Sequence, residues 1–262
     1  MILVTILAVI GRLTLGLFAN VGRMAVFASR ALYSVVVPRY YLQQWWKQFV
    51  EMCFFSLPVI GLTGLFTGMV LALQGQAALS RLGSEAAIPE LVAISILREL
   101  GPVVAGLMLA GRVGSSVAAE LSTMRVNEQV DALTTMSIDP WRYLIAPRLV
   151  AATAALPVLV VIANVIGIGG GYLVATFQLD FEGQQFLAAT LSFIQPQDWA
   201  LSLTKAVIFG FIVGLFGCFM GFNATGSAQG VGLATTNAVV ASSITLLLAD
   251  LLIALAFFRF LG

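Results

Sequence analysis

Residues 91–124 read LVAISILRELGPVVAGLMLAGRVGSSVAAELSTM, and this stretch sets the class of the protein. It is mostly apolar and longer than the roughly 20 residues that a membrane-spanning helix needs. Inside it, Arg98 and Glu99 stand side by side and Pro102 follows. Proline has no N–H, so a helix through Pro102 leaves the carbonyl of Arg98 without its usual donor. Two charges and a free acceptor at membrane depth predict a pocket lined by protein or water, because lipid cannot satisfy them.

The whole chain has the composition of an integral membrane protein. Of its 262 residues 60% are hydrophobic and 10% are charged, and the mean hydropathy is +1.01, whereas soluble domains are about 25% charged. The chain has no histidine, no cysteine cluster with metal-ligand spacing and no basic patch for nucleic acid. We therefore expect no metal, no catalytic residue and no nucleic-acid partner. Cys53 and Cys218 lie in apolar segments and are interpreted as packing residues.

Working outward from residues 91–124, the pattern predicts an all-α protein with five transmembrane helices. The last apolar run is long enough for two spans, which the turn-forming segment 221–230 divides. We assign residues 1–50 to an N-terminal interfacial region and residues 51–262 to one transmembrane domain. The expected spans are residues 55–79, 91–124, 148–177, 199–222 and 232–258.

The basic residues predict the orientation of these spans, because cytoplasmic loops carry the excess of lysine and arginine. Five spans place the two termini on opposite sides of the membrane. With the N-terminus inside, eight basic residues fall on the cytoplasmic side and two outside: Arg12, Arg23, Arg30, Arg39, Lys47, Arg125, Arg142 and Arg148 against Arg81 and Arg259. We expect a cytoplasmic N-terminus and a periplasmic C-terminus.

The first 35 residues carry a basic stripe. Arg12, Arg23 and Arg30 are spaced by 11 and 7 residues, which places them on one side of a helix whose other faces are apolar. This pattern predicts an amphipathic helix in the membrane interface, and a sixth, poorly hydrophobic span is the alternative. Pro38 is expected to end the helix. An interfacial aromatic belt is expected to follow at Tyr40, Tyr41, Trp45 and Trp46.

Residues 125–136 predict a short amphipathic helix in the second cytoplasmic segment. Asn127 is expected to cap it, Glu128 and Asp131 to lie in its first turn, and Asp139-Pro140 to end it. Such a helix suits a transporter driven by a cytosolic motor, although an ordinary solvated loop helix has the same pattern. Arg112 and Glu120 are expected to form structural or gating ion pairs.

Glycines at three- or four-residue spacing mark predicted helix contacts. Small residues let helix backbones approach closely, so we expect packing rather than hinges at these positions. A second amphipathic helix is expected on the periplasmic side, in the segment 180–198. The glycines are Gly61, Gly64 and Gly68, Gly167 and Gly169 to Gly171, and Gly210, Gly214, Gly217 and Gly221.

A series of short motifs resembles the MlaE permease family from about residue 55 to the C-terminus. They occur in the order and at the spacing of that family. They are Arg98-Glu99-Leu100-Gly101-Pro102, Ala110-Gly111-Arg112-Val113-Gly114, Ala119-Glu120, Met124, Glu128-Gln129, Asp131-Ala132-Leu133, Asp139-Pro140, Pro147-Arg148, Gly230-Val231-Gly232, Ala234-Thr235-Thr236, Ala238-Val239-Val240 and Asp250.

The resemblance implies the transmembrane subunit of an ATP-driven ABC transporter in the bacterial inner membrane. Members move phospholipid between the inner and outer membranes and maintain outer-membrane lipid asymmetry. The implied assembly is a homodimer with two MlaF-like ABC ATPases, an MlaB-like STAS-domain subunit and a periplasmic MlaD-like hexamer of MCE proteins. The sequence holds no phosphate-binding loop of the form GxxxxGK[ST], so ATP and magnesium are expected on the partner ATPase.

The resemblance also implies two sets of functional residues. The coupling helix that docks on the ATPase is expected to use Glu128, Gln129, Asp131, Ala132 and Leu133. Arg98 is expected to meet the lipid phosphate and Glu99 to orient it or an amine headgroup, with acyl chains against Val70, Leu71 and Leu73. The alternative is that Arg98 and Glu99 only pair with neighbouring helices, because adjacent residues point about 100° apart.

Two other classes of function remain open at this point. An ion-coupled carrier would use Glu99, Glu120 and Asp250 as relay groups. A membrane anchor would only hold a periplasmic lipid-binding ring in place.

Overall fold

The computed structural model describes residues 2–36 and 41–261, with side chains described for all of these except 2–14, 17, 82, 85, 260 and 261. These residues form helices and connecting turns, and no strand occurs among them. Pro38 and Tyr40, which were expected to end the first helix and to begin the aromatic belt, lie outside the described residues. So do the side chains of Arg12 and of the other residues near the N-terminus.

Five helices among the described residues are long and apolar enough to cross a membrane, as predicted. The first is α2 (Leu42–Leu79), and the second is a composite of α3 (Ile88–Ser95), α4 (Gly101–Leu109) and α5 (Ser115–Val126). The third comprises η5 (Trp141–Ile145) and α7 (Ala146–Gln178). The last two are α9 (Pro196–Phe222) and α10 (Ala228–Leu261). Each contains the corresponding predicted span within its bounds.

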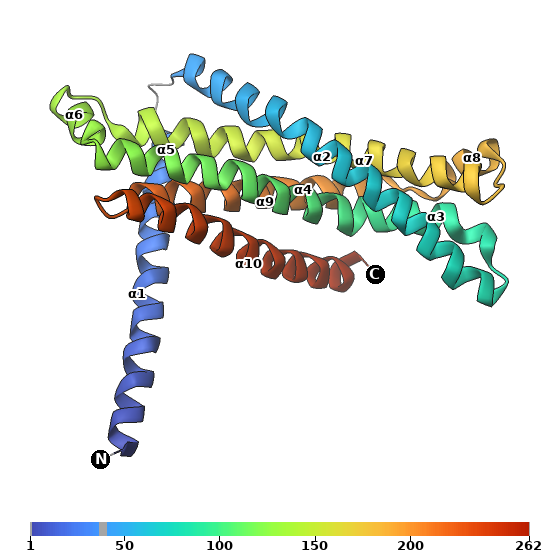
Figure 1. Cartoon of the computed structure of the whole chain (residues 1–262), viewed down its shortest axis with the longest axis horizontal. Coiled ribbons are helices and arrows are strands. Elements are labelled where there is room, and N and C mark those ends of the chain that lie inside the picture. The colour runs from blue at the N-terminus through green and yellow to red at the C-terminus, as the bar shows by residue number, and fades with distance from the viewer. Residues whose placement is uncertain (1, 37–40, 262) are drawn as a thin grey trace.

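Wide helical turns interrupt the second of these helices. They are the π-helical turns η3 (Ile96–Leu100) and η4 (Ala110–Gly114), which separate α3, α4 and α5 without breaking the continuous rod in Figure 1. Two short 3₁₀ turns, η1 (Ser80–Leu82) and η2 (Glu85–Ala87), connect α2 to this rod. Because α2 and the rod run in opposite directions, the end of α2 lies beside the start of α3 (Figure 1).

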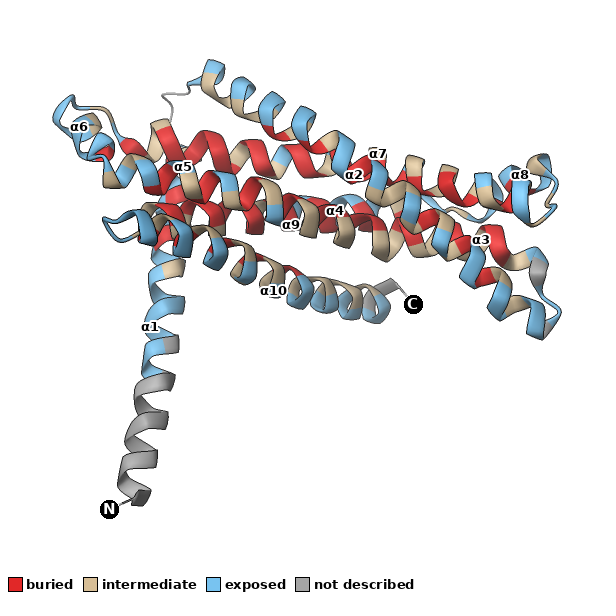
Figure 2. Cartoon of the chain, in the orientation of Figure 1, coloured by how far each residue is buried: buried red, intermediate tan, exposed pale blue. Residues whose placement is uncertain are grey.

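Small residues bring α2 and α7 into backbone contact. A Cβ atom on Gly68 would lie 1.8 Å from the carbonyl oxygen of Gly167, and one on Gly170 would lie 2.3 Å from that of Leu65. Gly210 of α9 approaches Ala152 of α7 in the same way, at 2.6 Å. The predicted packing role is therefore confirmed at these positions. The buried residues fill the centre of the bundle, while the outer faces of α2 and α10 remain exposed (Figure 2).

The first helix, α1 (Ile2–Val36), lies across one end of the bundle instead of along it (Figure 1). It is not among the membrane-spanning candidates of the described residues. Phe27 is buried against Trp141 and Phe219, which fixes α1 to the bundle. Arg23 and Arg30 are exposed. This arrangement favours a helix in the plane of the membrane, which stays a prediction.

Two short helices project at opposite ends of the bundle (Figure 1). The helix α6 (Gln129–Thr135) lies at the end where α1 crosses, and α8 (Gly183–Phe193) lies at the other end. α8 falls in the segment where a second amphipathic helix was expected, with Phe186 buried and Leu191 exposed.

The expected limits of α6 were wrong in two respects. Asn127 does not cap it but ends α5, and Glu128 precedes the first turn of α6 with a left-handed φ of 58° and no capping hydrogen bond from its side chain. Asp139-Pro140 does not end α6, which stops at Thr135. Instead, the Asp139 carboxylate accepts a hydrogen bond of 3.0 Å from the N–H of Trp141 and so caps the next helix.

Candidate functional site

Arg98 and Glu99 both lie on the π-helical turn η3. The N–H of Gly101 bonds to the carbonyl of Ile96, five residues earlier, and Pro102 then occupies the first turn of α4. The wide turn and the missing N–H of Pro102 leave the Arg98 carbonyl free for another donor. That donor is the ammonium group of Lys205, whose Nζ lies 3.0 Å from the Arg98 oxygen. The free acceptor expected from the sequence is confirmed.

Lys205 is fully buried, at 0% exposure, and three oxygen atoms surround its ammonium group. Besides the Arg98 carbonyl, they are Oε2 of Glu99 and Oδ1 of Asp250, each at 2.7 Å. The ammonium group donates hydrogen bonds to the Arg98 carbonyl and to Glu99, while Asp250 contributes an ion pair. A buried charge is costly unless it is paired, and Lys205 therefore ties η3, α9 and α10 together.

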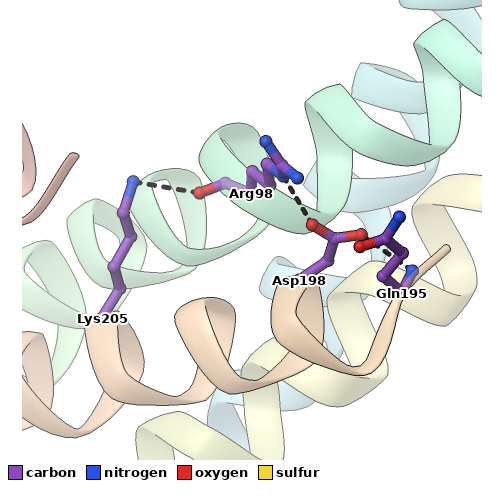
Figure 3. A network of polar contacts seen from close by, with 4 residues as sticks. All are labelled: Arg98, Gln195, Asp198 and Lys205. Carbon is purple, nitrogen blue, oxygen red and sulfur yellow. Dashed lines mark hydrogen bonds and ion pairs between the residues drawn. The ribbon is translucent and has the colours of Figure 1, made fainter. Parts of the chain in front are cut away.

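Arg98 makes a separate ion pair with Asp198 in the first turn of α9 (Figure 3). The Nε–Oδ1 distance is 2.6 Å, and Asp198 is 2% exposed. The other carboxylate oxygen of Asp198 accepts the backbone N–H of Gln195 at 2.9 Å and caps α9. Arg98 also lies over the ring of Phe257, 5.7 Å from its centroid.

The edge of the Arg98 guanidinium that carries its terminal nitrogens remains available for hydrogen bonds. The side chain is 30% exposed, and among the described residues only Nε makes a hydrogen bond, which leaves Nη1 and Nη2 free for a ligand. The structure thus shows the pairing with neighbouring helices that was one of the two interpretations of Arg98 and Glu99. Contact with a lipid phosphate, the other interpretation, stays a prediction that this geometry permits.

The cluster at η3 joins residues that are far apart in the sequence. With two cations, Arg98 and Lys205, and three anions, Glu99, Asp198 and Asp250, its formal charge is 2 − 3 = −1. Lys205 and Asp198 were not among the predicted site residues, although each is an isolated charge in or beside an apolar span. An unpaired charge at that depth is itself a signal that a partner exists.

The predicted acyl-chain residues lie on α2, at a depth similar to that of Arg98. Val70 precedes the end of α2 by nine residues and Arg98 follows the start of α3 by ten, which is about 14 Å in each case at 1.5 Å per residue. Val70 and Leu73 are exposed, and Leu71 packs against the small cluster around Ala72 and Val92. The exposed pair faces away from the bundle.

The predicted coupling residues gather on and beside α6. Glu128, Gln129, Asp131 and Ala132 are exposed, and Leu133 packs partly against the core. Nη1 of Arg125 lies 3.0 Å from Oδ1 of Asp131, and the Arg125 guanidinium lies over Phe222. These contacts fasten α6 to the end of the bundle and leave its outer side free for a partner.

Arg112 and Glu120 do not pair with each other. Glu120 forms an ion pair of 2.8 Å with the buried Arg148, as expected for a structural pair. Nη1 of Arg112 instead donates to Oγ of Ser56 at 2.7 Å, and no ion pair of Arg112 occurs among the described residues. The expected ion pair is therefore confirmed for Glu120 and not for Arg112.

Comparison with known proteins gives a consistent result over nearly the whole chain. The family model of the permease MlaE matches residues 45–256. A probable ABC transporter permease protein of Rickettsia bellii is 46% identical over 95% of this chain and 96% of its own length. The intermembrane phospholipid transport system permease protein MlaE of Haemophilus influenzae is 34% identical over 96% and 97%, respectively. A probable ABC transporter permease protein of Synechocystis sp. is 35% identical over 79% of each chain.

These matches cover the five apolar helices and the charged cluster at η3 together. The chain therefore belongs to the MlaE family and is an ABC transporter permease.

Proposed function

We propose that this chain is the membrane-spanning subunit of an ATP-driven transporter that moves phospholipids between the inner and outer membranes and so maintains outer-membrane lipid asymmetry. The observation that carries the proposal is which nitrogens of Arg98 are bonded and which are free. Asp198 holds its Nε at 2.6 Å, while the terminal nitrogens remain free. A guanidinium group that is fixed on one side and open on the other suits a phosphate, which it can bind through two parallel hydrogen bonds.

Apolar residues at a depth similar to that of Arg98 suit the acyl chains of a phospholipid. Exposed Val70 and Leu73, at a similar depth on α2, offer apolar contacts for acyl chains, with half-buried Leu71 beside them. Glu99 is 45% exposed in its side chain and can orient the headgroup while it holds Lys205. The relative from Haemophilus influenzae, which is named for phospholipid transport, supports the same substrate class.

The assembly that we propose follows from the family and from the exposed surfaces. The outer face of α10 is apolar and suits a second copy of the chain, and the outer face of α2 is apolar and suits lipid. The exposed side of α6 suits an MlaF-like ATPase that binds ATP and magnesium, accompanied by an MlaB-like subunit. α8 lies at the opposite end, where an MlaD-like hexamer would sit on the periplasmic side (Figure 1). In this assembly the chain lies in the bacterial inner membrane, with its N-terminus in the cytoplasm.

The substitution Arg98→Lys tests the proposed lipid contact. Lysine keeps the charge beside Asp198 but lacks the planar pair of terminal nitrogens. We expect phospholipid bound to the purified complex to fall about tenfold, the equivalent of one lost charge-assisted hydrogen bond, while the complex stays assembled. Phospholipid per complex is measured by mass spectrometry and assembly by size-exclusion chromatography.

The matched control is Arg142→Lys, because Arg142 is also held by a carboxylate, that of Asp139 at 3.3 Å, but lies near α6 and not near η3. It should leave the bound phospholipid unchanged. Wild-type lipid content in an intact Arg98→Lys complex would show that Arg98 is only structural.

The net charge of −1 of the η3 cluster also favours a second candidate, a carrier coupled to ions or protons. The two functions differ in their energy source. Reconstituted in proteoliposomes without the ATPase, a carrier would move lipid in response to a pH gradient. The proposed ABC transporter would not, and it would regain transport when the ATPase and ATP are added.

A further inference from the structure

A second polar cavity lies near the end of the bundle where α6 projects. Its volume is about 200 Å³, and it opens between the start of α2 and the junction of η4 with α5. None of its residues belongs to the η3 cluster. The side chains that line it are Gln48, Glu51, Met52, Arg112, Ser116 and Glu120, together with Val113 and Val117.

The cavity holds one cation and one anion without ion-pair partners among the described residues. Arg112 is fixed by Ser56 Oγ at 2.7 Å and by the ring of Phe55, whose centroid lies 5.6 Å from the guanidinium carbon. Glu51 is exposed and makes no ion pair in the part of the chain that the structure describes. Glu120 is partly neutralised by Arg148. The walls therefore offer a positive group and a negative group to one ligand.

The two charges lie at different depths. The contact of Arg112 with Ser56 places the guanidinium about 7.5 Å deeper along α2 than Glu51, which precedes Ser56 by five residues. Glu120 follows Arg112 by eight residues and so lies about 12 Å nearer the α6 end. The cation is thus deep and the carboxylates are shallow. A phospholipid of the adjacent leaflet has the same polarity, with its phosphate nearer the acyl chains and its amine nearer the water.

An apolar stripe on α2 begins beside the cavity and runs away from the α6 end of the bundle. It lies on the exposed side of α2 and, at 100° per residue, stays within about 100° of the direction of Glu51. From first to last it covers 18 residue steps, or about 27 Å, close to the hydrocarbon thickness of about 30 Å. It ends at two of the predicted acyl-chain residues. The stripe consists of Phe55, Val59, Leu62, Phe66, Val70 and Leu73, all of which are exposed.

We propose that the cavity at Arg112 and Glu51 binds the headgroup of an amine-bearing phospholipid from the cytoplasmic leaflet, and that the α2 stripe leads its acyl chains toward the site at Arg98. The proposal rests on the phospholipid-transport function proposed above and adds a second headgroup site on the cytoplasmic side. Arg112 binds the phosphate, and Glu51 accepts hydrogen bonds from the ammonium group. A second copy of the chain on the same stripe is the competing occupant that the experiment separates.

The test places a photo-crosslinking amino acid at Gln48 in the assembled transporter, reconstituted in phosphatidylcholine nanodiscs. Radiolabelled phosphatidylethanolamine, which has a phosphate and a primary amine, is compared with phosphatidylglycerol, which has only the phosphate. Arg112→Gln should lower crosslinking of both lipids about tenfold, whereas Glu51→Gln should lower only that of phosphatidylethanolamine. Arg112→Lys should restore part of the loss, which a general folding defect would not allow.

Arg81→Gln is the control for removing an exposed arginine elsewhere and should change neither yield. Competition by inorganic phosphate should leave the lipid crosslinks intact, since the stripe contributes to lipid binding alone. A crosslink between two copies of the chain in place of lipid, displacement by phosphate, or equal yields with Arg112→Gln would each overturn the inference. The lipid loss in Arg98→Lys is measured separately, so the proposed function can stand if this second site fails.

Discussion

Lys205 is fully buried in a bundle that a bilayer would surround, and its three oxygen partners are what make that position tolerable. One of those oxygens is free because Arg98 lies on the wide turn η3 and Pro102 has no N–H to offer to its carbonyl. The helix breaker and the buried lysine are therefore two parts of one arrangement. Without Lys205, Asp250, which is 19% exposed, would lose its cation, and Glu99 would keep only the solvent that reaches its 45% exposed side chain.

We predict that Lys205→Met destabilises the chain by about 3–5 kcal/mol, the usual cost of removing one partner from a buried ion pair. Thermal unfolding in detergent measures the change. The sequence contains one other lysine, Lys47, which is exposed, and Lys47→Met should stay within about 0.5 kcal/mol of the wild type. Equal stability of the two variants would mean that the oxygens around Lys205 do not depend on its charge.

The sequence predicted part of this cluster. Arg98, Glu99 and the free carbonyl follow from neighbours in the chain, and local patterns carry such information. The partners Asp198 and Lys205 lie 100 and 107 positions from Arg98, and only helix packing brings them to η3. The signal available was indirect. The uncharged run 206–249 is bounded by Lys205 and Asp250, and both of these charges lie within expected spans and need partners.

Among the helices, the spans were predictable because length and hydropathy determine them, and all five fall where they were expected. The details at their ends were not. Whether Asp139 ends one helix or caps the next depends on the bond to the Trp141 N–H, and the pattern Asp-Pro permits both. The π-helical turns at Arg98 and Arg112 were also missed, since the apolar pattern of the span does not distinguish them from an α-helix.

The contact of α2 with α7 yields a prediction about glycine. In Gly68→Ala, the new Cβ would lie 1.8 Å from the Gly167 carbonyl oxygen, which is backbone and cannot rotate away. The two helices must separate, and we expect a loss of about 1–3 kcal/mol, as for overpacked cores. Gly232→Ala on α10 is the matched control, because nothing lies within 4 Å of its Cβ and alanine is the better helix former. Denaturation of both variants in the same detergent tests the difference, and a Gly68→Ala chain as stable as Gly232→Ala would contradict it.

Across the molecule, the structure separates three regions along one axis. α6 projects at one end, the η3 cluster lies within the bundle toward the other end, and α8 projects beyond it (Figure 1). α5, η4, α4 and η3 form a continuous rod from α6 to Arg98. Motion of α6 under the proposed cytosolic motor can therefore reach the proposed lipid site through one helix. Because Lys205 joins that rod to α9 and α10, the three would respond together.

The proposed coupling role of α6 predicts the effect of reversing its charges. In Glu128→Lys with Asp131→Lys, two exposed carboxylates become cations on the surface proposed to meet the ATPase. The Arg125–Asp131 pair that is lost is exposed on both sides, so the fold should lose at most about 1 kcal/mol. Reversed charges at an interface repel their former partners, and we expect ATPase affinity to fall about tenfold or more. ATPase retained on the affinity-purified permease measures this, together with phospholipid bound by the permease, which should persist.

Glu182→Lys, a reversal beside α8 at the opposite end, should leave the ATPase in place. If the double variant keeps its ATPases and still moves lipid with ATP, the motor must bind elsewhere, and the chain's cytoplasmic contact would have to be sought on α1 or the loop before α10.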